Sequence, residues 1–344
     1  MNDVHSLTER ERRVLEAVIE TYIATAEPAG SNTVARRSTL GISSASIRST
    51  MSELEGKGFL YHPHTSAGRI PTDRAYRVYV DAMLGRVPPA PDLCEHLEIE
   101  LTAGLSGDDL LLRAAQVLGI LTQELGVAVA PAFEAIVLQR VDLVAVSSDR
   151  LLVVLNLQSG TVRSIYIRLR GALERDRIDD LQRLLNERLA GLTLRDIRSS
   201  YADRLRDAGT TPDLADLLDI IVAEGEEIFE LPTSRDAVVL GNASVLVDQP
   251  EFATSEQMRS LLTLTERSGL LRDALAERKR EGLTVTIGGE HEEPGLAAFT
   301  LVTSTYRRGS ATGVIGVLGP TRMPYDKIVG LVEHTGRLIE GLIQ

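Results

Sequence analysis

The hydrophobic pattern at the start of the chain predicts a helix. Apolar side chains recur at the spacing of one helix face from Val14 to Tyr22. Thr8 and Glu11 stand three positions apart just before this stretch, which is typical of a capping box, in which both side chains satisfy free amides at a helix start. The segment 27–30, Glu-Pro-Ala-Gly, ends the helix because proline and glycine disfavour its continuation.

Two shorter helices and a hairpin are predicted next. Serine residues can cap one helix over 31–37 and another over 44–56. Strand-like segments at 58–62 and 69–72 flank a loop of small polar residues. Because this is the order of elements in a winged helix-turn-helix domain, the sequence predicts that fold for residues 1–87.

A proline-rich linker divides the chain. Val87-Pro-Pro-Ala-Pro cannot continue a helix and favours a stiff, extended spacer. After it the pattern predicts helices near 92–125, 178–189, 214–222, 255–267, 270–281 and from 324, and strands near 133–146, 151–158, 161–169, 237–247, 283–288, 297–307 and 312–318. Strands, a mostly helical middle and strands again indicate an α+β domain split by an insertion. We expect this domain over 88–175 and 276–344, with the insertion over 176–275.

The charge distribution changes the picture that the net charge suggests. The 344 residues carry 37 basic and 49 acidic side chains, a net charge of −12 that argues against a polyanion partner. Residues 1–87 hold 11 basic and 10 acidic groups, which leaves 26 against 39 for the rest. Within residues 36–77, seven basic groups face three acidic ones, and this local excess indicates a polyanion partner unless the arginines only solubilise the helices.

Several classes of protein are excluded on composition. A single cysteine, Cys94, cannot form an internal disulfide, and no Cys/His set has metal-ligand spacing. No stretch approaches the roughly 18–20 apolar residues of a membrane span, and the first residues lack a signal-peptide core, so we expect a cytoplasmic protein. Gly313, Gly316 and Gly319 fit a buried strand better than a nucleotide loop, and 290–293, Glu-His-Glu-Glu, fits a solvated hairpin tip. We expect no enzyme, no metal and no cofactor.

The third predicted helix separates into two faces. Ile47, Met51 and Leu54 form one apolar stripe. The opposite face carries only small side chains and one arginine: Ala45, Arg48, Ser49 and Ser52. Such a face suits a DNA groove, because small residues allow close approach while hydroxyl and guanidinium groups bind phosphates or bases. The alternative is an ordinary solvated helix face.

The predicted hairpin loop adds candidate phosphate donors. Four groups in it are compact donors: the side chains of His64, Thr65 and Ser66 and the amide of Gly68. Gly68 is expected to permit a tight turn, and Arg69 to reach a minor groove from the hairpin tip. The alternative is a hairpin with a polar tip and no ligand.

These segments also resemble a known family, the bacterial heat-inducible transcription repressors HrcA. The resemblance rests on the runs 40–55, LGISSASIRSTMSELE, and 63–73, PHTSAGRIPTD. It extends to Leu7-Thr-Glu-Arg, Glu27-Pro-Ala-Gly-Ser, Ile287-Gly-Gly-Glu and the run 313–325, GVIGVLGPTRMPY. Agreement covers residues 7 to 344 and is densest at both ends.

The resemblance implies a specific mechanism. Such proteins join a winged helix to a GAF-like domain that is interrupted by an inserted dimerisation domain. They bind as homodimers to an inverted-repeat DNA operator (CIRCE) before chaperone operons, and the chaperonin GroEL keeps them active. Recognition would fall to Ser44, Ala45, Ser46, Arg48 and Ser49, and the wing would be His64 through Arg69. Arg36 and Arg37 would add phosphate contacts, and the location would be cytoplasmic and nucleoid-associated.

The chain departs from the family pattern at the predicted recognition helix. Thr, Asn and Glu are usual in the family where this chain has Ser46, Ser49 and Thr50. Loss of an asparagine at position 49 removes a good reader of adenine, so operator preference is expected to differ in detail. Two alternatives stay open: a transcription factor whose GAF-like domain senses a small metabolite, and a protein that is chiefly a chaperonin client.

Overall fold

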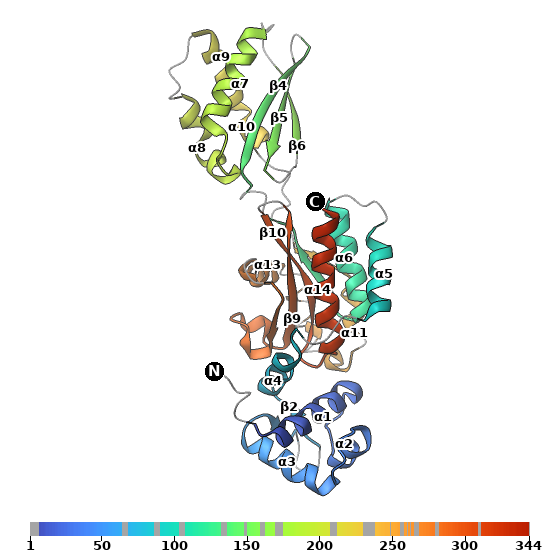
Figure 1. The fold of residues 1–344 in the computed structure, drawn as a ribbon. Helices are drawn as coiled ribbons and strands as arrows, with labels where there is room; N and C mark the ends of the chain where they lie inside the picture. Colours follow the sequence, from blue (N-terminus) through green and yellow to red (C-terminus); the bar gives the residue numbers. More distant parts are fainter. Residues whose placement is uncertain are drawn as a thin grey trace. The chain divides into compact units, whose positions relative to one another are not determined.

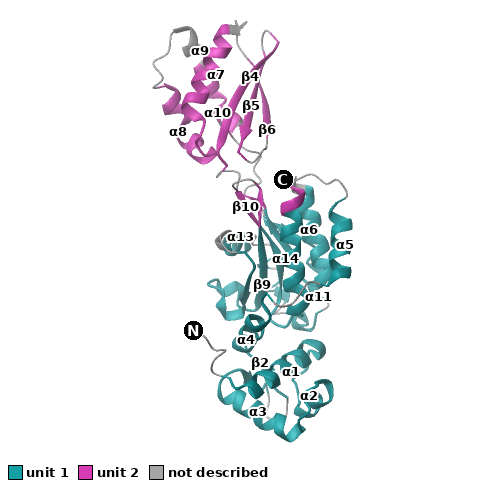
Figure 2. Ribbon diagram, in the orientation of Figure 1, with its two compact units in different colours: residues 1–129, 238–305, 314–339 teal, residues 130–237, 306–313, 340–344 magenta. Residues whose placement is uncertain are grey.

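The fold mixes helices and strands in two compact units (Figure 2). Unit 1 comprises residues 1–129, 238–305 and 314–339, and unit 2 comprises 130–237, 306–313 and 340–344. The computed structural model describes residues 7–63, 68–85, 90–102, 107–131, 136–147, 150–158, 162–168, 175–206, 212–229, 238–247, 249–254, 258–259, 261, 263–264, 268–278, 282–308 and 311–343. The predicted α+β class is confirmed. Within the described ranges, no helix is both long and apolar enough to cross a bilayer.

The N-terminal part of unit 1 has the predicted order of elements. It consists of α1 (Glu9–Thr25), α2 (Ser31–Arg37), α3 (Ser44–Gly56), β1 (Leu60–Tyr61), β2 (Ile70–Pro71) and α4 (Asp73–Met83) (Figure 1). The predicted capping box is present, since the Thr8 amide donates to Glu11 Oε2 at 2.8 Å and the Glu11 amide donates to Thr8 Oγ1 at 3.3 Å. Helix α4, which Thr72 caps, was not predicted.

The apolar stripe predicted for α3 forms the core of this part. Ile47, Met51 and Leu54 are fully buried, as are Val14, Val18 and Ile19 of α1, and helices α1 and α3 contact each other. Burial of this face leaves the opposite face of α3 for solvent or a partner.

The rest of unit 1 contains a five-stranded sheet with helices on both faces (Figure 1), and the ends of two of its strands, 306–308 and 311–313, are grouped with unit 2. The strand order is β7 (Val238–Leu240), β3 (Leu125–Val129), β10 (Ala311–Pro320), β9 (Phe299–Arg308) and β8 (Thr284–Ile287). The surrounding helices are α5 (Pro91–Leu101), α6 (Gly107–Thr122), α11 (Ser244–Val247), η3 (Pro250–Phe252), α13 (Ser268–Glu277), η5 (Gly288–Glu290), η6 (Pro294–Leu296) and α14 (Tyr325–Leu342).

Alternation along β9 assigns the two faces. Phe299 and Leu301 share a buried cluster with Leu271 of α13. The side chain of the intervening Thr300 points to the other face, where its Oγ1 lies 3.2 Å from the hydroxyl of Tyr325 at the start of α14. One sheet face therefore packs on α13 and the other on α14.

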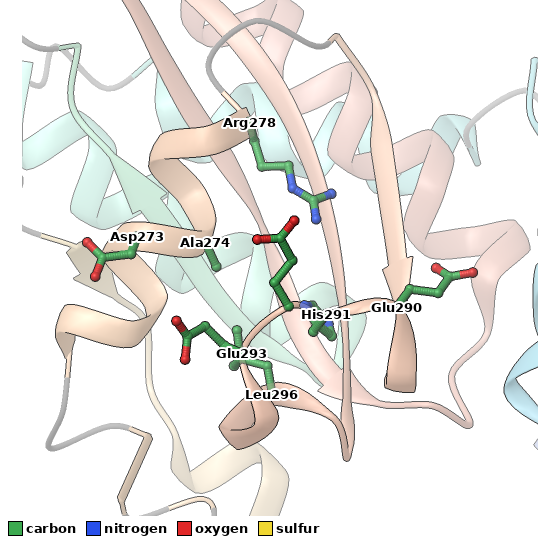
Figure 3. A pocket seen from close by; sticks show the side chains of 8 residues that line it. Asp273, Ala274, Arg278, Glu290, His291, Glu293 and Leu296 are labelled. Atoms are coloured by element: carbon green, nitrogen blue, oxygen red, sulfur yellow. The ribbon is translucent and has the colours of Figure 1, made fainter.

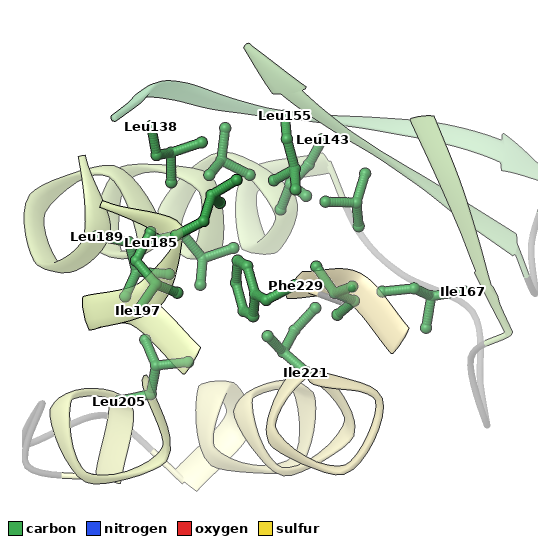
Figure 4. Close-up of a cluster of buried hydrophobic side chains, with 14 of the residues drawn as sticks. Leu138, Leu143, Leu155, Ile167, Leu185, Leu189, Ile197, Leu205, Ile221 and Phe229 are labelled. Carbon is green, nitrogen blue, oxygen red and sulfur yellow. The ribbon is translucent and has the colours of Figure 1, made fainter. Parts of the chain in front are cut away.

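Unit 2 contains an antiparallel three-stranded sheet packed on helices. Its elements are β4 (Leu138–Ser147), β5 (Arg150–Leu157), β6 (Val162–Arg168), α7 (Arg175–Leu189), α8 (Leu194–Arg206), α9 (Pro212–Ala223) and α10 (Gly225–Phe229). Their aliphatic core surrounds Phe229 (Figure 4). Two amide side chains of α7 bind the β4 backbone: Asn186 exchanges hydrogen bonds of 2.8 and 2.7 Å with Val141, and Gln182 accepts from Leu143 at 2.8 Å. These bonds satisfy peptide groups on the free edge of β4.

Several predicted elements need correction. The single helix over 92–125 is two helices, α5 and α6, and its last residue already belongs to β3. The strand over 237–247 ends at Leu240, and α11 follows from Ser244. The linker lies partly outside the described residues, and Pro91 is the first residue of α5, where its missing amide costs no hydrogen bond. Helix α8 was not predicted.

A buried carboxyl group in unit 1 predicts a pH-dependent stability. Glu124, between α6 and β3, is 2% exposed, and burial raises its pKa from an ordinary 4.5 to about 8, although a hydrogen bond from Gln249 opposes the shift. Between these two values the unfolded chain is ionised and the folded one is protonated, so this group lowers stability as pH rises. We expect Glu124→Gln to remove that dependence and to be the more stable protein above pH 8.

Urea unfolding at pH 5, 7 and 9 measures this difference. The gap between Glu124→Gln and the parent should grow from pH 5 to pH 9. Glu187→Gln, on the exposed side of α7, is the matched control and should give a constant difference. A gap for Glu124→Gln that does not change with pH would contradict the prediction.

Candidate nucleic-acid interface

Helix α3 presents the predicted outer face to solvent. Ser43 caps the helix by accepting from the Ser46 amide at 3.2 Å. The exposed residues of this face are Ala45, Arg48, Ser49 and Ser52, with Ser44 and Ser46 half-buried beside them. Thr50, in contrast, is buried, and its hydroxyl donates to the Ser46 carbonyl at 3.2 Å. The presence of threonine where glutamate is usual in the family therefore does not change the exposed face.

Only part of the basic excess in residues 36–77 is available to a partner. Lys57 binds the buried Glu11 carboxylate at 2.7 Å, and this contact lowers the pKa of Glu11. Arg74 donates to the Lys57 carbonyl at 2.8 Å and lies over the Phe59 ring at 4.4 Å. Arg77 and Arg69 also have partners inside unit 1.

Three arginines of the same window are left for solvent or a ligand. Arg48 on α3 and Arg36 and Arg37 at the end of α2 are all exposed. Their guanidinium groups form no hydrogen bond or ion pair with any residue that the structure describes. Arg37 also lines a hollow of about 280 Å³ that contains Glu16 and Glu20, so two carboxylates stand near its charge.

Arg69 lies at the base of the hairpin and not at its tip. Its backbone pairs with Ala29 through hydrogen bonds of 2.9 and 3.0 Å. Its side chain, 12% exposed, binds Glu55 at 3.1 Å and donates to Ser52 Oγ at 2.8 Å. The predicted reach into a minor groove therefore needs correction, because the guanidinium is held against α3.

Gly68 is required by close packing. A Cβ at this position would lie 2.3 Å from the Pro28 carbonyl oxygen and 2.5 Å from the Ala29 carbonyl carbon. Its backbone is not in the left-handed region, so close approach explains the glycine better than the predicted tight turn. His64, Thr65 and Ser66 lie outside the described residues.

The sequence reasoning missed one basic residue beside α3. Arg10 on α1 is exposed and donates to the Ser46 carbonyl at 3.3 Å, next to the first turn of α3. The two residues are 36 positions apart, so only the packing of α1 on α3 brings them together.

A second candidate site lies in unit 1 around residues 290–293. Its cavity of about 260 Å³ is lined by Asp273, Ala274, Arg278, Glu290, His291, Glu292, Glu293 and Leu296 (Figure 3). Burial lowers the pKa of His291. Glu290, Glu292 and Glu293 are exposed, as the predicted solvated segment requires, and Glu290 also binds Arg77. The mixed charges of this lining favour no single class of ligand.

A helix face of small side chains with one exposed arginine fits the class of proteins that place one helix in a nucleic-acid groove. Comparison with known proteins is more specific. The family model described as the HrcA protein C terminal domain matches residues 108–329. The chain belongs to the HrcA family.

Similar proteins span the whole chain. The heat-inducible transcription repressor HrcA of Chlorobium phaeobacteroides (strain BS1) is 37% identical over 343 residues, covering 96% of each chain. That of Chlorobium limicola is 38% identical over 346 residues, with the same coverage. A crystal structure of a hypothetical protein aligns over 98% of each chain with a TM-score of 0.63 and 25% identity.

Proposed function

We propose that this chain is a heat-inducible transcription repressor that binds DNA through a winged helix formed by α1 to α3, β1 and β2. The observation that carries the proposal is the outer face of α3, where Arg48 stands exposed among small side chains. The names of the relatives support it.

Within this proposal, α3 enters the major groove. Ser44, Ala45, Ser46 and Ser49 allow close approach and offer hydroxyl groups, while Arg48 binds a guanine or a phosphate. Arg36 and Arg37 add phosphate contacts from α2. Arg69 acts indirectly, because its bonds to Ser52 and Glu55 hold the hairpin against α3. The wing residues His64, Thr65 and Ser66 remain a prediction.

We further propose that the protein acts as a homodimer on the CIRCE inverted repeat and that GroEL maintains its activity. The sheet of unit 1 with its helices would be the GAF-like domain, and unit 2, which holds residues 176–237 of the predicted insertion, would supply the dimer contact. These assignments rest on the family resemblance. Two winged helices on a twofold axis would match the symmetry of an inverted repeat.

Operator binding with and without GroEL tests the proposal. Fluorescence anisotropy should show tighter binding to a duplex carrying the CIRCE repeat than to a scrambled duplex of equal length. Each neutralised phosphate should add about −0.9 to the slope of log K against log salt. GroEL should increase the fraction of protein that binds. Equal affinity for the two duplexes under both conditions would overturn the proposal.

A further inference from the structure

Arg322 connects the segment after β10 with the N-terminal helices. Its Nε and NH2 groups bind the two carboxylate oxygens of Glu251, the latter at 2.9 Å. Its NH1 group donates to the Ile23 carbonyl at 2.7 Å, across 299 positions of sequence. The side chain is only 15% exposed. Arg322 belongs to the run 313–325, which is part of the family resemblance.

The Ile23 carbonyl is a favourable place for a cation. It lies in the last turn of α1, where carbonyl groups lack helical partners and the helix dipole is negative. The last turn of α1 has no basic residue of its own. Glu251 is held in place because its neighbour Phe252 is buried and stacked on Phe299 at 5.9 Å. Arg322 thus bridges a helix end and a fixed carboxylate.

Arg77 makes a second connection of the same kind from α4. It binds Glu290 and donates to the Val285 carbonyl at 2.6 Å. One turn earlier, Asp73 accepts from the Gly289 amide at 2.9 Å. Gly288 has φ of +50° and a Cβ there would lie 2.2 Å from the Asp73 carboxylate, so this glycine of Ile287-Gly-Gly-Glu makes room for α4.

Aromatic packing completes the contact. Tyr325 is fully buried, and its ring centroid lies 5.7 Å from that of Tyr76 and 6.5 Å from that of Tyr79. The Tyr325 hydroxyl donates to the Thr321 carbonyl at 2.7 Å, beside Arg322. The N-terminal helices are therefore joined to the rest of unit 1 by the hydrogen bond from Arg322 to the Ile23 carbonyl, by the Arg77–Glu290 ion pair and by this aromatic packing.

We propose that Arg322 and Arg77 are positioning residues for DNA recognition, which hold α1 and α4 on the body of unit 1 in one orientation. The consequence for DNA rests on the proposed function. Two half-sites of an inverted repeat have a fixed separation, so a dimer binds both only when each α3 is held in a defined place. Loss of the Arg322 contact frees the helices to rotate and weakens simultaneous binding.

A distance measurement without DNA tests the positioning role alone. Spin labels at Glu53→Cys and Leu112→Cys, in a Cys94→Ala background, report the distance from α3 to α6 by pulsed electron resonance. We expect a narrow distribution in the parent and a clearly broader one in Arg322→Gln. Arg183→Gln, which removes an exposed pair with Asp180, is the matched control and should stay narrow. An unchanged distribution in Arg322→Gln would overturn the proposal.

The folding and the DNA binding of each variant are measured separately. Thermal unfolding by circular dichroism identifies a variant that does not fold, in which case Arg77→Gln, which removes the second connection, replaces Arg322→Gln. We expect Arg322→Gln to bind the full inverted repeat about tenfold more weakly and a single half-site within about twofold of the parent. Equal losses on both duplexes would overturn the positioning role. A parent that binds neither duplex refutes the proposed function. The distance measurement still tests whether Arg322 holds the N-terminal helices on the body of unit 1.

Discussion

Replacing Gly68 with alanine is expected to lower the free energy of unfolding of the N-terminal helices by about 3 kcal/mol, the upper end of the usual cost of overpacking. The new Cβ would lie 2.3 Å from the Pro28 carbonyl oxygen and 2.5 Å from the Pro28 and Ala29 carbonyl carbons. All three are backbone atoms, so no flexible side chain can move aside. The backbone pairing of Ala29 with Arg69 would have to open to relieve the clash.

Displacement of Arg69 would also affect the proposed DNA-binding face of α3. The Arg69 guanidinium binds Ser52 and Glu55 on α3, so a shifted hairpin base loses its attachment to that helix. We therefore expect Gly68→Ala to weaken operator binding in addition to stability. If Gly68 instead supplied only a phosphate-binding amide, alanine would retain that amide and stability would be unchanged.

Urea unfolding followed by circular dichroism measures the effect. Gly56→Ala is the matched control, because a Cβ at Gly56 meets nothing within 4 Å. At this helical position alanine is expected to stabilise by about 0.5–1 kcal/mol relative to glycine. A Gly68→Ala protein as stable as the parent would contradict the close packing of residues 28, 29 and 68.

The features that the sequence predicts well are local. The two faces of α3 follow from the helical spacing of Ile47, Met51 and Leu54, and the structure buries all three. The capping box of Thr8 and Glu11 depends only on residues three positions apart. Such features need no knowledge of how distant segments pack.

Features that depend on distant residues could not be predicted. Residues 36–77 carry a basic excess, but four of its seven basic side chains bind groups within unit 1: Lys57, Arg69, Arg74 and Arg77. Pattern alone cannot distinguish an arginine that binds DNA from one that binds a carboxylate elsewhere in the chain. Arg322 is the extreme case, since its partner Ile23 is 299 positions away.

Ambiguous patterns account for other misses. Leu125 to Val129 is a short apolar run that fits the end of a buried helix as well as a buried strand. In the structure this run is a strand that packs closely on α6. Gly126 permits this packing, because a Cβ there would collide with the Ala115 carbonyl. Helix α4 had an available signal in the Thr72 cap and the buried spacing of Tyr76 and Val80. The proline-rich segment that follows α4 predicts a linker and gives no information on this helix.

Replacing Arg48 with alanine is expected to have the largest effect on DNA binding. A lost arginine contact costs about 1–3 kcal/mol, and a dimer would lose it at both half-sites. Arg48 is exposed, and its guanidinium binds no group within the described parts of the chain, so the loss should leave stability unchanged. Arg183→Ala, an exposed arginine of α7, is the matched control for charge and should bind like the parent.

Affinity measured at several salt concentrations, and on duplexes with single base changes, then identifies what Arg48 contacts. If it binds phosphate, the slope of log K against log salt should fall by about 0.9 for each half-site, and every duplex should be weakened alike. If it reads a base, the slope should stay closer to that of the parent and discrimination should relax at one position of each half-site. Arg69→Ala separates a direct contact from an indirect one, because Arg69 already binds Glu55 and its removal should lower stability as well as affinity. Unchanged affinity of Arg48→Ala at every salt concentration would remove α3 as the recognition helix, since no other exposed side chain on that face carries a positive charge.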